Sequence, residues 1–210
     1  MQYQRETFKD EDHVRVHPII TKGGDLVNVI PSEVVLEALV RGKNTGAILD
    51  TDRKTDRSYK AGADALGAGY EIETMPGYLP QIPASANSAL VEAVKLAVPG
   101  KAFTLTESSK HSGGSTDVGD LQHIQPVLTF HTGGITGALH SSEFDVVDED
   151  EAYVLTAKIF ALGAYRLLKD KAAQAKEAVE HYKPVFTKDS YIEFMESLIR
   201  KERKEVTGNE

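Results

Sequence analysis

The sequence predicts a mixed fold of the α/β or α+β class, and three patterns carry that expectation. Apolar and polar residues alternate over 14–20 and again over 33–41, which is the period-two pattern of β-strands. A helical pattern follows over 45–68, and a short alternating stretch covers 69–75. The order strand, strand, helix, strand with short connections indicates a small α+β layer.

Each of the first two predicted strands has one polar face and one apolar face. Between 14 and 20, valines alternate with Arg15 and His17, so these two polar side chains share one face. The segment 33–41 has the pattern of a half-buried strand, with Arg41 on its polar face.

The helix over 45–68 has recognisable ends. Asn44 or Thr45 is a suitable N-cap, and Gly69 lies where a helix-terminating glycine is expected. The next segment, 76–85, holds three prolines and is expected to be a hinge or linker.

The second part of the chain alternates helical and loop patterns. A helix is expected over 88–98, ended by Pro99 and Gly100, and another begins near Asp148, which forms a capping box with Glu151. The remaining expectations are a strand at 101–109, a glycine-rich loop at 111–120, an apolar strand at 125–134, and a charged helical tail from about 171 with a cap at Ser190 and Glu193.

Composition narrows the function classes. The 210 residues carry a net charge of −8, which disfavours nucleic acid as a partner because no basic excess exists to neutralise phosphates. The chain has no cysteine, so disulfides and thiolate metal sites are excluded. A polar N-terminus and the lack of any run of about 18 apolar residues predict a cytoplasmic protein with no membrane partner.

The segment GGITGALHSSEF, residues 133–144, is the most informative local feature. Three glycines precede His140, which is compatible with a metal ligand, a catalytic base or a histidine packed in a tight turn. Asp117, in GGSTDVGD, is similarly ambiguous: it is either an N-cap or a carboxylate that orients a metal-bound histidine. His17 is either solvated or presented to an active site.

Several common site motifs are missing from the sequence. His111, His123 and His131 do not have the spacing of a motif such as HExxH. The glycine cluster is not followed by Lys-Ser or Lys-Thr, so it is not a phosphate-binding loop, and GxSxG is absent.

Three segments together resemble one family. VHPIITKGGDLVNVIPSEVVLEALVRG, GGSTDVGDLQHIQP and TGGITGALHSSEF are similar to the dinuclear metal amidohydrolases of the aminoacylase/carboxypeptidase group, in the branch of p-aminobenzoyl-glutamate and indole-acetyl-amino-acid hydrolases. The resemblance covers most of residues 5–170. It implies a catalytic α/β domain that binds two zinc or manganese ions, interrupted by a ferredoxin-like lid that also forms a homodimer.

The resemblance gives each domain a range and implies roles for individual residues. It places a partial lid and dimerisation domain at 1–80, the C-terminal part of a zinc-peptidase-like catalytic domain at 81–170, and a helical extension at 171–210. By position, His17 resembles the lid histidine that reaches the partner's active site and polarises the scissile carbonyl. The other matched residues are Asn28 and Arg41 as substrate ligands, His140 as a metal ligand, Gly133, Gly134 and Gly137 as the turn lining the substrate pocket, and Asp117 without a firm role.

Two sequence motifs that the family uses for metal binding and catalysis are missing from these 210 residues. The family's H-x-D motif and Glu-Glu pair supply most metal ligands and the general base, and neither motif occurs here. We therefore expect the C-terminal half of an amidohydrolase acting on N-acyl or N-aroyl amino acids or related small amides. Alone, this half should be inactive and hold no metal tightly, because a catalytic zinc needs about three protein ligands. Its expected partners are the N-terminal half, a second copy through the lid, and a small amide substrate. The alternative is a non-catalytic dimerisation module or truncated pseudoenzyme.

Overall fold

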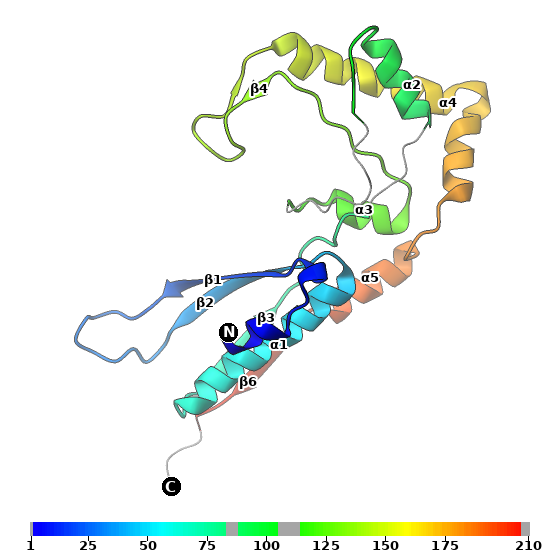
Figure 1. Cartoon of the computed structure of the whole chain (residues 1–210). Helices are drawn as coiled ribbons and strands as arrows, with labels where there is room; N and C mark the ends of the chain where they lie inside the picture. The colour runs from blue at the N-terminus through cyan, green and yellow to red at the C-terminus, as the bar shows by residue number, and fades with distance from the viewer. Residues whose placement is uncertain (1, 83–87, 105–113, 207–210) are drawn as a thin grey trace. The chain divides into compact units, whose positions relative to one another are not determined.

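The computed structural model describes residues 2–82, 88–104 and 114–206 and shows an α+β protein (Figure 1). The chain divides into two compact units. Unit 1 contains Met1–Gln81, Gly114–Asp120 and Lys188–Glu210, and unit 2 contains Ile82–Gly113 and Leu121–Thr187. The chain therefore passes from unit 1 to unit 2 twice: it returns to unit 1 at Gly114–Asp120 and again at Lys188.

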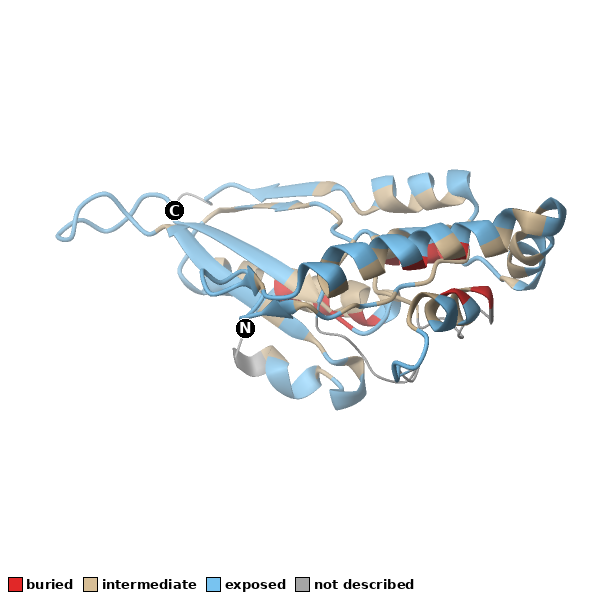
Figure 2. Cartoon of the chain, turned by 90° about the horizontal axis from the view of Figure 1, so that it is seen from above, coloured by how far each residue is buried: buried red, intermediate tan, exposed pale blue. Residues whose placement is uncertain are grey.

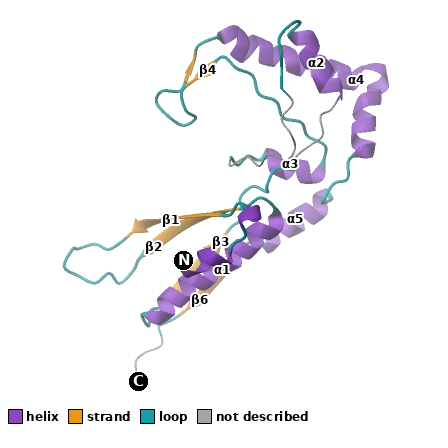
Figure 3. Ribbon diagram, viewed as in Figure 1, coloured by secondary structure: helices purple, strands orange, loops and turns teal. Residues whose placement is uncertain are grey.

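Unit 1 combines two separate two-stranded sheets with one long helix (Figure 3). Its elements are η1 (Gln2–Thr7), η2 (Asp10–Asp12), β1 (Arg15–Lys22), β2 (Val35–Arg41), α1 (Thr45–Ala65), β3 (Tyr70–Thr74), α5 (Lys188–Ser197) and β6 (Arg200–Lys204). The expected order strand, strand, helix, strand is confirmed.

Unit 2 is mainly helical. Its elements are α2 (Ser88–Ala97), β4 (Ile135–Thr136), β5 (Asp145–Val146), the π-helix η3 (Asp150–Leu155) and α4 (Thr156–His181), and it shares α3 (Val118–Ile124) with unit 1. Four residues with non-helical backbone, Lys169 to Ala172, interrupt α4. No helix of the described residues has the length and hydropathy needed to cross a bilayer.

The ends of α1 follow from local chemistry. Asn44 is the N-cap, because its side-chain oxygen accepts a 2.8 Å hydrogen bond from the backbone N–H of Ala47. The helix ends at Ala65, and Gly67 adopts the left-handed conformation with φ of 64°. The expectation that Gly69 terminates the helix is therefore wrong: Gly67 supplies the positive φ, two residues earlier.

Four further expectations differ from the structure. Residues 125–134 form no strand; only Ile135–Thr136 pair, with β5. The described part of 101–109, residues 101–104, is also not a strand, and the glycine-rich loop ends where α3 begins at Val118. Ser190 is not a cap, because α5 already begins at Lys188. The capping-box-like start at Asp148 is present in one half: Asp148 Oδ1 accepts from the Glu151 N–H at 2.9 Å, whereas the Asp148 N–H donates to the Gly134 carbonyl.

Each unit has a small core. In unit 1 the buried side chains include Ala47, Thr51 and Thr55, which lie four residues apart along α1. In unit 2, Ala89 and Ala93 of α2 pack with Ile159 and Gly163 of α4, where small residues let the two helices approach closely. Figure 2 shows how few residues are buried and how much of the strand surface is exposed.

Candidate functional site

The β1–β2 hairpin places two of the predicted site residues on one face. The strands are antiparallel, with Arg15 opposite Arg41 and His17 opposite Leu39. Because paired residues share a face, His17 and Arg41 lie diagonally across the same face. The side chain of His17 is exposed and that of Arg41 is half-buried. Both side chains thus belong to one local surface of unit 1.

The other face of the hairpin is entirely apolar. It is formed by Val16, Pro18 and Ile20 of β1 opposite Val40, Ala38 and Leu36 of β2. Ile20 is 65% exposed and Leu36 is 47% exposed. The expected half-buried strand at 33–41 is therefore wrong for these residues: within the described residues, no element covers this face along its length.

Asn28 lies away from His17 and Arg41. It belongs to the loop between the two strands, residues 23–34, in which the Val29 N–H donates to the Leu26 carbonyl. His17 is five residues before the end of β1, so the strand separates it from this loop. The hairpin as it stands does not join Asn28 to the surface that holds His17 and Arg41.

In unit 2, His140 sits on a short loop between β4 and β5. Its side chain is exposed and its φ is 64°, a left-handed conformation that is uncommon for a residue with a side chain. The loop is fixed at its base because Ser141 Oγ donates to the Ala138 carbonyl at 2.8 Å. The structure thus presents His140 to solvent from a tight turn and rules out the alternative of a buried histidine.

The glycines before His140 allow close backbone packing. Gly134 has a φ of 83°, its carbonyl accepts from the N–H groups of Val147 and Asp148, and a Cβ there would lie 2.4 Å from the Asp148 carbonyl oxygen. Gly137, with a φ of 76°, is equally close to the Glu143 carbonyl, at 2.2 Å. These two positions therefore require glycine for the turn itself.

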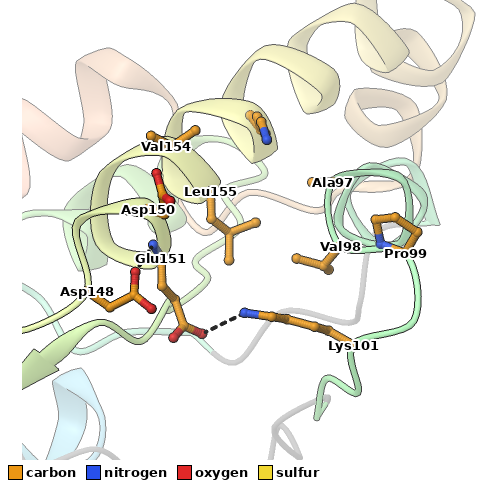
Figure 4. Close-up of a pocket in the computed structure, with 10 residues that line it drawn as sticks. Ala97, Val98, Pro99, Lys101, Asp148, Asp150, Glu151, Val154 and Leu155 are labelled. Atoms are coloured by element: carbon orange, nitrogen blue, oxygen red, sulfur yellow. Dashed lines mark hydrogen bonds and ion pairs between the residues drawn. The ribbon is translucent and has the colours of Figure 1, made fainter.

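A cavity of about 370 Å³ lies between the end of α2 and the start of η3 (Figure 4). Lys101 and Glu151 face each other across it, with Nζ and Oε1 3.6 Å apart. A Cβ on Gly133 would lie 3.0 Å from the carboxyl carbon of Glu151, so the glycine turn borders the same carboxylate. The three glycines are not among the lining residues, which are Ala97, Val98, Pro99, Lys101, Asp148, Asp150, Glu151, Val154, Leu155 and Lys158.

Asp117 lies just before α3 in unit 1. It is exposed, and its carboxylate accepts a 3.1 Å hydrogen bond from the Thr116 hydroxyl. The Asp120 N–H donates to the Asp117 carbonyl, as in the first turn of a helix. These contacts favour the helix-start interpretation of Asp117 over a role beside a metal-bound histidine.

The neighbouring polar residues of α3 fix two chain segments. Asp120 Oδ1 accepts from the Leu79 N–H at 2.9 Å in unit 1, and Gln122 Oε1 accepts from the Ile82 N–H at 3.0 Å in unit 2. Burial raises the pKa of Tyr191, and the negative charge of the nearby Asp120 carboxylate raises it further. Sequence reasoning missed these roles, because nothing in GDLQH distinguishes an anchoring amide from a solvated one.

The described residues do not by themselves fit a metal centre. No group of three or more histidine, aspartate or glutamate side chains with metal-binding geometry occurs among them. His140 is the predicted ligand of unit 2, and among the residues described it belongs to no group of three or more potential ligands. A single imidazole is insufficient for a zinc site, which needs about three protein ligands.

Comparison with known proteins adds no further constraint. No family model, no curated protein and no solved structure matches this chain.

Proposed function

We propose that this chain contributes substrate-binding groups and one metal ligand to a metal-dependent amidohydrolase of N-acyl or N-aroyl amino acids or related small amides. The observation that carries the proposal is the shared face of His17 and Arg41. The resemblance to the amidohydrolase family points to one residue on each strand, and the register of β1 and β2 sets these two residues diagonally on one face of the hairpin.

Each residue suits a distinct task at an amide substrate. The planar guanidinium of Arg41 can bind a carboxylate through two parallel hydrogen bonds. The imidazole of His17, exposed beside it, can donate a hydrogen bond to the amide oxygen as negative charge develops there. The Arg15 side chain, directly opposite Arg41, adds a second positive charge to this surface.

The proposal requires further residues from outside these 210. His140 alone cannot hold a metal ion, and no residue here matches the family's general base. We propose that a segment carrying H-x-D and Glu-Glu completes the site, with either zinc or manganese, and that unit 1 also contacts a second copy in a cytoplasmic enzyme. In the ferredoxin-like arrangement the hairpin, α1 and β3 would be the retained part of the lid.

Exposed apolar side chains in unit 1 support a missing interface. Ile19 and Ile20 of β1 are 61% and 65% exposed, and Leu36 and Leu39 of β2 are 47% and 48% exposed. Apolar side chains exposed next to one another are typical of a surface that another chain covers.

The topology of unit 1 supports the same conclusion. β2, α1 and β3 follow one another with connections of a few residues, so they form a β–α–β crossover, whose strands normally belong to one sheet. Here β2 pairs with β1 and β3 pairs with β6, in separate sheets. A strand from outside the described residues would join them into one sheet.

Metal content tests the proposal. The purified chain is analysed for zinc and manganese per polypeptide after growth in medium supplemented with both. We expect a value near zero, with about two ions bound when the chain is co-purified with a segment bearing H-x-D and Glu-Glu. Two tightly held ions in the chain alone would overturn the proposal.

Activity of that complex tests the residue roles. Release of glutamate from N-acetylglutamate should fall at least 100-fold in His17→Ala. Arg41→Ala should mainly raise KM, with Arg41→Lys recovering part of the loss. A complex that binds two ions but is unaffected by His17→Ala would refute the role of His17.

The exposed apolar hairpin face favours one second candidate, a non-catalytic interaction module. Val27 in the hairpin loop is fully exposed at 109% and Ile30 is 92% exposed, as expected of a protein-binding surface. In that case the complex would form but bind no metal and hydrolyse no N-acetylglutamate.

A further inference from the structure

The C-terminal strand β6 has an unusual composition for a strand. Its sequence, RKERK, contains no apolar side chain, yet it pairs in antiparallel register with all five residues of β3, from Tyr70 opposite Lys204 to Thr74 opposite Arg200. Hydrophobic burial therefore contributes little to the attachment of β6. Backbone hydrogen bonds and charge must hold it.

One side of β6 matches a row of charged side chains on α1. Arg200 contacts Asp52 and Asp56, Glu202 contacts Lys60, and Lys204 contacts Asp64, with each closest nitrogen–oxygen distance between 2.5 and 2.6 Å. The α1 residues are four positions apart, so they form one row along the helix.

The order of charges also fixes the register of β6. Along α1 the row is acidic, acidic, basic, acidic, and β6 presents basic, acidic, basic to it. A shift of β6 by two residues would bring Arg200 to Lys60 or Glu202 to an aspartate. Because like charges at such distances repel, the pairing is specific rather than a general attraction of a basic strand to an acidic surface.

The other side of β6 is held by β3. Lys201 Nζ lies 2.8 Å from Glu71 and 2.5 Å from Glu73, and Arg203 lies 4.0 Å from Glu71. Except around Arg200 and Lys60, these groups are largely in contact with solvent. Ion pairs of this kind weaken as salt rises, because the screening length falls from about 10 Å at 0.1 M to about 3 Å at 1 M.

The connection before β6 permits its release. Leu198 and Ile199 lie between α5 and β6 and belong to neither a helix nor a strand. α5 itself is held in unit 1 by the hydrogen bond of Tyr191 with Asp120, so β6 can leave β3 while α5 stays in place. Release would expose an edge of β3 beside Asp52, Asp56, Asp64, Glu71 and Glu73.

We infer that the β3 edge and the row of charged side chains on α1 form a docking surface for a β-strand of complementary charge order, and that β6 of the same chain occupies it as a salt-sensitive latch. This inference is independent of the proposed enzymatic function. The latch is closed at low ionic strength and opens as salt rises, while the β1–β2 hairpin is unaffected.

Hydrogen exchange of the full chain at 50 mM and 1 M NaCl tests the latch. We expect amide protection in Tyr70–Thr74 and Arg200–Lys204 to fall at least tenfold at high salt, with that of β1 and β2 unchanged. Equal protection at both salt concentrations would overturn the inference. Protection that increases with protein concentration would also overturn it, since β6 would then dock on a second copy.

A charge exchange provides the second test. Lys60→Glu or Glu202→Lys alone should remove most of the protection at 50 mM NaCl, and the double variant should restore it. Lys22→Glu, in the surface pair Lys22–Glu33, is the matched control and should leave β6 protected. If Lys60→Glu fails to fold, Lys60→Gln and Glu202→Gln replace the charge exchange. The double Gln variant should then lose less amide protection of β6 than the sum of the losses in the two single variants. Additive losses would refute a direct pair.

Discussion

Arg200 holds together two carboxylates of α1 that would otherwise repel each other. Its Nη2 atom lies 2.6 Å from Oδ2 of Asp52 and 2.6 Å from Oδ2 of Asp56, which are one helical turn apart. The two aspartate side chains are only 18% and 15% exposed. These are the most buried ion pairs of the C-terminal strand, and they join the end of the chain to the first helix of unit 1.

Arg200→Ala should therefore destabilise unit 1 more than any other single change in β6. It leaves two half-buried aspartates adjacent without their shared partner, and breaking such a contact costs about 1–3 kcal/mol. Urea unfolding followed by circular dichroism measures the change.

Two variants isolate the cause of that loss. Arg200→Lys should recover only part of it, because the lysine side chain is one bond shorter and its nitrogen falls short of the position of Nη2 between the two carboxylates. Removing the repulsion with Asp56→Asn in the Arg200→Ala background should recover more than half. An Arg200→Ala protein as stable as the parent would contradict the role of this contact.

Acid should open the C-terminal strand. Hydrogen bonds from Lys201 lower the pKa of Glu71, and hydrogen bonds from Lys60 lower the pKa of Glu202, each from a usual value of 4.5. A carboxyl whose pKa is lowered on folding stabilises the fold above its unfolded pKa and loses that contribution as pH falls. Arg203 also faces Glu71, and Tyr70 and Arg200 face Glu202.

The expected window is thus the range from about pH 5 downward. Protection of β6 amides should be constant between about pH 5 and 10 and fall below this range. It should also fall above it, because the pKa values of Lys60, Lys201 and Lys204 are raised by the same partners. Glu71→Gln should weaken the acid transition. Protection that is unchanged at pH 3 would contradict an electrostatic attachment.

Local patterns predicted the elements that depend on neighbours in sequence. Alternation located β1 and β2, and it placed His17 and Arg41 on polar faces of their strands, because side-chain direction in a strand has a fixed period. The N-cap Asn44 and the hydrogen bond from the Glu151 N–H to the Asp148 side chain were also predictable, since both act within three residues.

Long-range pairing could not be predicted in this way. β6 has the polar composition of a solvated helix end, and its attachment depends on β3 and α1, more than a hundred residues earlier. The segment 125–134 shows the converse: its apolar residues have the composition of a strand, but the described residues provide no neighbouring strand to pair with it. The expectation of a strand at 125–134 was wrong because the composition of a segment does not show whether another strand is available to pair with it.

The turn that carries His140 should depend on Gly134. A Cβ at this position would lie 2.4 Å from the Asp148 carbonyl oxygen and 2.7 Å from the Ala152 nitrogen, and φ is 83°. Gly134→Ala should destabilise unit 2 by roughly 1–3 kcal/mol. Gly62, inside α1 with no atom within 4 Å of an added Cβ, is the control, and Gly62→Ala should stabilise by about 0.5–1 kcal/mol. Equal effects of the two substitutions, measured by thermal unfolding, would contradict this account.

The start of α1 should depend on Asn44. Its side-chain oxygen accepts from the Ala47 N–H at 2.8 Å, and Ala47 is buried directly beneath. Asn44→Ala should destabilise unit 1 by about 1 kcal/mol, and Asn44→Asp should retain most of the stability because aspartate caps equally well. Chemical denaturation distinguishes these outcomes, and an Asn44→Asp protein as unstable as Asn44→Ala would argue against capping.

Enlarging two small residues at the contact between α2 and α4 should change the stability of unit 2 in opposite directions. Ala93 is fully buried, so Ala93→Leu would force extra methylene groups into a filled interface and destabilise it by about 1–3 kcal/mol. A Cβ on Gly163 would instead lie 3.6 Å from Leu90 Cδ1, an ordinary contact distance, within a helix that glycine weakens. Gly163→Ala should therefore stabilise unit 2 by about 0.5–1 kcal/mol. Thermal unfolding of both variants measures the packing of the two helices directly. If both substitutions destabilise, α2 and α4 are closer in solution than these distances indicate; if neither does, they are farther apart.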